Sequence, residues 1–309
     1  MKIALKVDVD TYRGTCEGVP ALLALFERYG VKATFLFSMG PDHTGRALRR
    51  VLRPGFLRKV HRTSVVEHYG IKTLLYGVLL PGPDIGRKAG HLMNKTFVQG
   101  HEVGLHCYDH VRWQDAVAGK NKQWTENEMR KAYNAFRKAV GINPTTLGAA
   151  GWQLNKYVLA LEESMGFRYA SDVRGYAPFY PILDGMTSQC VQIPTTLPTL
   201  DELIGRDTIT SDNVHEVIRE AVRRPVPHGH VYTLHAELEG MKWLPVMERL
   251  LRSWLSQGVD IVTLSDIYRT LDLTALPRKN ILWREVEGRS GVLACEDCAT
   301  LTSATLTVA

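Results

Sequence analysis

Residues 2 to 10 read KIALKVDVD, an apolar run of strand length that ends in two aspartates. The alternation of side chains along an extended strand puts the four large apolar residues on one face and Lys6, Asp8 and Asp10 on the other. The Cα atoms of the two aspartates are then about 7 Å apart, so both carboxylates can reach one small centre and still take different roles. An edge strand with a solvated polar face is the simpler interpretation of the same pattern.

Further strand-like runs alternate with helical patterns along most of the chain, which favours parallel βα units. Roughly seven or eight such units are typical of a barrel surrounded by helices. The predicted strands are residues 2–9, 32–38, 102–106, 145–149, 168–172, 190–194, 230–235 and 260–264. The predicted helices are residues 19–29, 154–165, 212–222 and 245–257, and one that begins at a Thr125–Glu128 capping box and ends at Gly141.

Residues 41 to 98 interrupt this pattern, and we interpret them as an insertion after the second strand. Between positions 45 and 95, eleven Lys and Arg residues stand against two acids, so this stretch carries +9 although the whole chain carries only +6. A basic amphipathic segment beside an apolar one is typical of binding to an anionic membrane interface. The residues expected to bind membrane or substrate here are Arg46, Arg49, Arg50, Arg53, Leu74, Leu75, Tyr76 and Leu79. Alternatively, the apolar residues cover the barrel and the arginines form a solvated face.

The composition, with 45% hydrophobic and 23% charged residues, is that of a folded protein. The longest uncharged apolar stretch, residues 73–83, is shorter than the about 20 residues of a membrane-spanning helix. Five cysteines and an N-terminus without an apolar signal segment favour a reducing, cytoplasmic location. Cys295 and Cys298 form a single CxxC, so we expect them in a reduced, disordered tail and not in a zinc site.

Two histidines suggest a metal site. In residues 100–110, GHEVGLHCYDH, His106 and His110 are four positions apart after a strand-like run. On a helical turn such a pair lies side by side and can reach one metal, and an added aspartate leaves coordination positions for water and substrate. A pair of this kind is, by itself, more often found as ordinary surface residues.

A third histidine, His235, ends the predicted strand at 230–235. Catalytic groups gather at the carboxyl ends of the strands in a parallel barrel. Packing at a strand end would also explain this residue if it stood alone.

Taken together, these motifs resemble the polysaccharide deacetylase family, also called NodB-homology proteins or family 4 carbohydrate esterases. The resemblance covers roughly residues 1 to 270 and is carried, in order, by DVD, KATFLF, GHEVGLHCYDH, SDVRG and YTLH. It implies an α/β fold, a distorted (β/α)7-type barrel, and metal-dependent removal of an acyl group from a sugar nitrogen. It also implies the roles of five residues: Asp10, His106 and His110 as metal ligands, Asp8 as the base and His235 as the acid.

One motif of the family is missing from this sequence. The family carries an arginine-and-proline motif whose arginine steadies the base, but the matching region, residues 147–153, reads LGAAGWQ. We expect Arg174 to supply the missing charge, Asp172 to orient His235, and Trp152 to contact substrate. The plain alternatives are a strand end with a turn for SDVRG and a tight turn with Trp152 packed beside it for GAAGW.

The sequence is most similar to one branch of the family, the deformylases of a lipid-linked amino sugar. The similarity runs nearly end to end and includes KVDVDTYRGTCEGVP, FLFSMGPDHTGRALRR, GAAGWQ and EGRSGVLAC. It implies hydrolysis of the formamide of 4-deoxy-4-formamido-L-arabinose phosphoundecaprenol to the free amino sugar lipid and formate, in lipid A modification and polymyxin resistance. It further implies one divalent metal, zinc by family preference, with cobalt, manganese or iron open.

The expected partners are the lipid-linked sugar phosphate and the cytoplasmic leaflet of the inner membrane, with no nucleic acid. We expect a barrel at residues 1–275 that contains a membrane-interface insertion at 41–98, and a peripheral tail at 276–309. One alternative function is an N-acetyl polysaccharide or peptidoglycan deacetylase, which the lack of a signal segment disfavours. The other is a non-catalytic barrel that binds lipid or nucleic-acid phosphates, which the full set of chemical residues disfavours.

Overall fold

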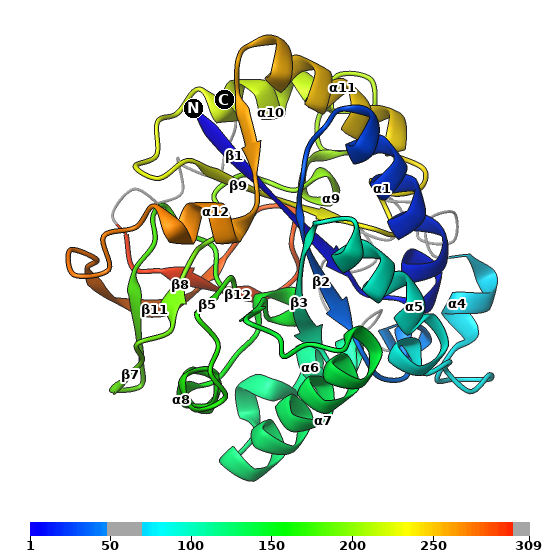
Figure 1. Ribbon diagram of the computed structural model, residues 1–309, viewed down its shortest axis with the longest axis vertical. Helices are drawn as coiled ribbons and strands as arrows, with labels where there is room; N and C mark the ends of the chain where they lie inside the picture. The colour runs from blue at the N-terminus through cyan, green and yellow to red at the C-terminus, as the bar shows by residue number, and fades with distance from the viewer. Residues whose placement is uncertain (48–69, 299–309) are drawn as a thin grey trace.

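The computed structural model describes residues 1–47 and 70–298, and its centre is a curled sheet of eight parallel strands (Figure 1). These strands are β1 (Lys2–Val9), β2 (Thr34–Ser38), β3 (Glu102–Cys107), β4 (Thr146–Leu147), β5 (Tyr169–Ala170), β8 (Val191–Gln192), β9 (His230–His235) and β10 (Asp260–Val262). Their order is β10-β1-β2-β3-β4-β5-β8, with β9 paired to β1. All eight predicted strands are present, and the predicted α/β architecture is confirmed.

Strand β1 lies in the interior of the sheet. Its residues pair with β9 along one edge, and with β10 and then β2 along the other. Ile3, Leu5 and Val7 face the main hydrophobic core, whereas Lys6 and Asp8 point to the opposite side and are also buried. The predicted alternation is therefore correct, and the edge-strand interpretation is wrong.

Helices surround the sheet on its outer side (Figure 1). They are α1 (Val19–Arg28), α4 (Ile71–Leu75), α5 (Ile85–Val98), α6 (His110–Ala116), α7 (Lys122–Val140), α8 (Lys156–Ser164), α9 (Leu200–Leu203), α10 (Val214–Val222), α11 (Leu244–Ser256) and α12 (Leu264–Arg269). Their apolar faces bury large side chains such as Phe26, Phe136 and Trp254 in one core with the strands. Within the described part of the chain, no helix has the length and apolar character needed to cross a bilayer.

Helix α7 begins earlier than predicted. Asn121 is its N-cap, and the side-chain oxygen of Asn121 accepts a hydrogen bond from the backbone N–H of Trp124 at 3.0 Å. Thr125 and Glu128 lie inside the helix, so the predicted capping box is wrong. The helix does end at Gly141, whose left-handed conformation (φ 88°) permits the turn that follows.

Helix α5 is a regular crossover helix between β2 and β3, although it falls in the predicted insertion. Ile85, Ala89 and Met93 are buried, and a Cβ on Gly90 would lie 2.8 Å from Ala139 Cβ on α7, so the two helices pack closely. Of the rest of the predicted insertion, residues 41–47 and 70–84 are described. Arg49, Arg50 and Arg53 lie outside the described residues.

A second sheet of four strands packs beside the barrel. In Figure 1 it lies at the lower left, opposite α1 and α5. Its order is β12 (Val292–Glu296), β11 (Arg278–Glu285), β6 (Tyr180–Leu183) and β7 (Met186–Thr187). The backbone of Arg174 bonds to β12, donating to Ala294 O at 2.9 Å and accepting from Glu296 N at 2.8 Å. Cys295 is buried against Trp152, so the expected disordered tail is wrong as far as residue 298. The domain boundaries at 275 and 276 stay a prediction.

One buried histidine makes the stability of this fold depend on pH. His101 Nδ1 accepts a hydrogen bond from Ala33 N at 3.2 Å, and the ring meets Phe35 edge-on with 5.3 Å between centroids. Burial, helped by the charge of Lys32, lowers the pKa of His101 from 6.5 to about 4. Between these two pH values the ring is neutral in the folded protein and protonated in an unfolded chain.

We expect acid to reduce the contribution of His101 to stability between pH 6.5 and 4, because the unfolded chain binds a proton there that the folded chain does not. The stability advantage of wild type over His101→Asn should shrink by up to about 2 kcal/mol between pH 7 and pH 4.5. Urea unfolding of both proteins at the two pH values measures it. An unchanged advantage would contradict this account of His101.

Candidate metal centre and active site

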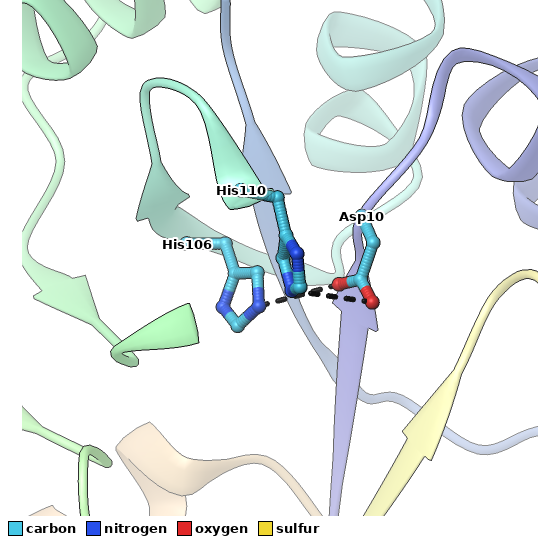
Figure 2. A group of neighbouring side chains, drawn as sticks. All are labelled: Asp10, His106 and His110. Carbon is cyan, nitrogen blue, oxygen red and sulfur yellow. Dashed lines mark ion pairs between the residues drawn. The ribbon is translucent and has the colours of Figure 1, made fainter. Parts of the chain in front are cut away.

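Asp10, His106 and His110 form a compact group at the carboxyl ends of the strands. Asp10 follows β1, His106 lies near the end of β3, and His110 begins α6; one ligand atom from each lies within 4.8 Å of the other two. The Nε2 atoms of His106 and His110 are 3.2 and 3.4 Å from the two carboxylate oxygens of Asp10, as Figure 2 shows. The three predicted metal ligands are therefore brought together.

The two histidines meet for a different reason than predicted. They do not share a helical turn, because His106 belongs to a strand and His110 to the first turn of a helix. Between them Asp109 caps α6, accepting from Arg112 N at 3.1 Å. This abrupt strand-to-helix turn brings the two ring centroids to 5.3 Å from each other.

The donor atoms suit a divalent metal. His106 Nδ1 is 2.7 Å from Gly148 O, a contact that requires the proton on Nδ1 and leaves Nε2, beside Asp10, as the nitrogen that can bind a metal. Oδ1 of Asp10 is buried and makes no hydrogen bond among the described residues. Burial alone would raise the pKa of Asp10, but His110 and His106 lower it below its ordinary value, so the carboxylate stays ionised. Two nitrogens and one carboxylate oxygen form an open, catalytic type of site.

Glu237 holds the Asp10 segment in place, a role that the sequence did not reveal. Its Oε1 accepts from Asp10 N at 3.0 Å, Thr11 N at 2.7 Å and Thr11 Oγ1 at 2.8 Å. Gly14 makes room for this carboxylate, since a Cβ at that position would overlap it. The only sequence signal was its place two residues after His235.

Asp8 and His235 lie on neighbouring strands beside the metal ligands. They are direct partners in the parallel register of β1 and β9, so their side chains emerge on the same face of the sheet. Asp8 Oδ1 lies 4.0 Å from His106 Nδ1. The backbone N–H of His235 donates to Glu239 at 2.9 Å, and burial raises the pKa of Glu239 to about 8, so that carboxyl adds little negative charge beside His235 at neutral pH.

The cation nearest to Asp8 is Lys6. Lys6 Nζ is 3.5 Å from Asp8 Oδ2, and the alternation in the first strand had already put both residues on one face. Arg174 pairs with Glu202 at 2.5 Å and lies over the ring of Trp152, 5.1 Å from its centroid. The structure thus places Lys6, and not Arg174, beside Asp8.

Asp172 and Trp152 are not in the positions their predicted roles require. The oxygens of Asp172 accept from Ala149 N at 2.6 Å and Gln192 Nε2 at 2.8 Å, while His235 Nδ1 has no hydrogen-bond partner among the described residues. Asp172 therefore fixes the turn after β4. Trp152 is only 2% exposed and packs against residues of the β11–β12 hairpin.

A curled parallel sheet with an Asp-His-His centre, a second carboxylate and a histidine at its carboxyl edge defines the class of metal-dependent barrel hydrolases. Residues 2–170 match the polysaccharide deacetylase family, and the chain belongs to this family. The matched region contains Asp8, Asp10, His106 and His110. The family is metal-dependent, and this chain has the donor set for such a metal.

Two relatives cover nearly the whole chain. A Shewanella sediminis protein described as a probable 4-deoxy-4-formamido-L-arabinose-phosphoundecaprenol deformylase, ArnD, is 39% identical over 294 residues, 95% of this chain and 94% of that protein. A Wigglesworthia glossinidia brevipalpis protein with the same description is 33% identical over 91% of this chain and 97% of its own. Among solved structures, one described as a polysaccharide deacetylase from Mycobacterium smegmatis has a TM-score of 0.63 at 15% identity, over 92% of this chain and 94% of that one. This match confirms the NodB-type barrel.

We expect His106→Ala to purify without metal, because it removes one of three protein ligands. Asp8→Asn is the matched control, since it alters a neighbouring carboxylate and should retain about one metal equivalent. Elemental analysis of the purified proteins by plasma mass spectrometry measures both. Stoichiometric metal in His106→Ala would contradict the ligand assignment.

Proposed function

We propose that this protein hydrolyses the formamide of 4-deoxy-4-formamido-L-arabinose phosphoundecaprenol, releasing formate and the free 4-amino sugar lipid. The observation that carries the proposal is the convergence of Asp8, His235 and the three ligand residues in a chain that matches two described deformylases along nearly its full length. In this role the protein contributes to lipid A modification and polymyxin resistance. We propose zinc as the metal, although the donor set also suits cobalt, manganese or iron.

We divide the chemistry between an acceptor and a donor of protons on neighbouring strands. When bound, a divalent metal supplies Lewis-acid activation of the attacking water and of the formyl carbonyl. Asp8 takes the proton from the water. His235, on the adjacent strand, donates a proton to the sugar nitrogen, because an amide nitrogen is a poor leaving group until it is protonated. Asp10, His106 and His110 would hold the metal beside these two groups.

We expect Asp8→Asn to lower kcat by at least about 10²-fold while the metal stays bound, because an amide cannot accept the proton. Asp260→Asn is the control: it changes an exposed aspartate in the neighbouring strand β10 and should leave turnover unchanged. Mass spectrometry of the lipid-linked sugar measures deformylation. Full activity of Asp8→Asn would refute the assignment of the base, and turnover of N-acetyl oligosaccharides without turnover of the formylated lipid would favour the deacetylase alternative.

We also propose that residues 41–84 dock on the cytoplasmic leaflet of the inner membrane. The apolar side chains of Ile71, Val78 and Leu79 are 69%, 54% and 75% exposed at α4 and the turn after it, at the periphery of the molecule (Figure 1). Leu74 and Leu75 are half-buried and Tyr76 is buried, so the exposed apolar surface differs from the one expected. Arg46 Nε donates to Gly77 O at 3.0 Å and joins the start of the basic stretch to this surface.

This surface is connected to the metal centre. Gly45 N donates to Tyr76 O at 3.0 Å, which ties the segment after β2 to the end of α4. Two residues earlier, His43 Nδ1 is 2.6 Å from Asp109 Oδ2, and Asp109 directly precedes the ligand His110. These contacts join the surface at α4 to the segment that carries the ligand His110.

We expect the joint change of Arg46, Arg49, Arg50 and Arg53 to Glu to abolish flotation with anionic liposomes, because it replaces attraction to the lipid phosphates by repulsion. The matched control changes four exposed basic residues of α7 to Glu: Arg130, Lys131, Arg137 and Lys138. Flotation that is unchanged in the first protein, or lost equally in the control, would contradict the docking proposal.

A further inference from the structure

Lys6 is a fully buried lysine in the middle of β1, with 0% of its surface exposed. A buried ammonium group is costly unless an opposite charge and hydrogen-bond acceptors surround it. Lys6 Nζ donates to Ser171 O at 2.9 Å, lies 3.5 Å from Asp8 Oδ2 and is 5.4 Å from the centroid of the Trp152 ring. The carboxylate that compensates its charge is therefore Asp8.

The two oxygens of Asp8 have different surroundings. Oδ2 faces Lys6, whereas Oδ1 lies towards His106 and makes no hydrogen bond among the described residues. An ion pair at one oxygen restricts rotation of the carboxylate and leaves the other oxygen on the side of the ligand residue His106. A base that takes a proton from water needs this arrangement: a fixed orientation and one open acceptor.

The surrounding fold is shaped to admit the lysine. A Cβ on Gly148, at the end of β4, would lie 3.1 Å from Lys6 Cε and 2.6 Å from a methyl group of Leu36. No side chain from β4 can therefore occupy this position next to Asp8. Gly148 also supplies the carbonyl that orients His106, so the glycine serves the lysine and a metal ligand together.

We propose that Lys6 is a positioning residue that acts through Asp8: its charge holds Oδ2 so that Oδ1 faces the attacking water. This inference rests on the proposed role of Asp8 as the base. The charge, and not only the hydrogen bond to Ser171, is the required property. Arginine should therefore replace lysine in function, while glutamine, which can still donate to Ser171 O, should not.

Steady-state kinetics of Lys6→Gln, Lys6→Met and Lys6→Arg, with metal content measured for each, test the proposal. We expect Gln and Met to lower kcat by about 10²-fold with KM within about twofold and metal retained, and Arg to recover kcat to within about fivefold of wild type. Lys279→Met is the control, because it also removes a lysine paired with a buried carboxylate, Glu296, but in the second sheet. A kcat of Lys6→Gln within twofold of wild type, or equal losses in Arg and Gln, would overturn the proposal.

A second measurement needs no substrate and so separates this inference from the proposed function. Urea unfolding midpoints of Lys6→Gln, Asp8→Asn and the double variant form a mutant cycle. We expect the double variant to lose less stability than the sum of the two single losses, because each single change leaves one charge buried without its partner. Additive losses would overturn the ion pair, whatever reaction the protein catalyses.

Discussion

Two carboxylates at the end of the central strand, Asp8 buried and Asp10 largely so, are the constraint on which the rest of this structure depends. A carboxylate leaves water only when cations or hydrogen-bond donors replace its hydration. For Asp10 the compensation comes from His106 and His110. For Asp8 it comes from Lys6 on the same strand. The pair can therefore remain charged in the interior, where interactions with a substrate are stronger than in water.

Much of the fold and the site could be predicted, because the signals are local. The period of two in β1 correctly put Lys6, Asp8 and Asp10 on one face, and the motif order correctly brought His106 and His110 to them. What the sequence did not show depends on contacts between distant segments. The ion pair of Arg174 needs Glu202, and the Asp172 contacts need Gln192, and neither partner is marked by spacing.

The predicted insertion wrongly included helix α5, although the sequence pattern of this helix is local. Ile85, Ala89 and Met93 recur every four residues and form a buried helical face, and Asp84 caps the helix by accepting from Arg87 N at 2.9 Å. The prediction gave more weight to the basic residues and to the prolines that precede this helix, Pro54, Pro81 and Pro83, than to its periodicity. The second sheet is a different case: β11 gains order by pairing with β6, about 100 residues earlier in the chain, which no local pattern reports.

Several contacts in this fold, such as those of Arg174 with β12, join segments that leave the ribosome far apart in time. A ribosome releases β1 first and β12 last, and β1 itself obtains its neighbours β9 and β10 only from the final third of the chain. The buried charges of the first strand therefore wait, during synthesis, for nearly the whole polypeptide before they are covered. Contacts of such long sequence separation slow folding, so the nascent chain spends this interval with Lys6 and Asp8 still open to solvent.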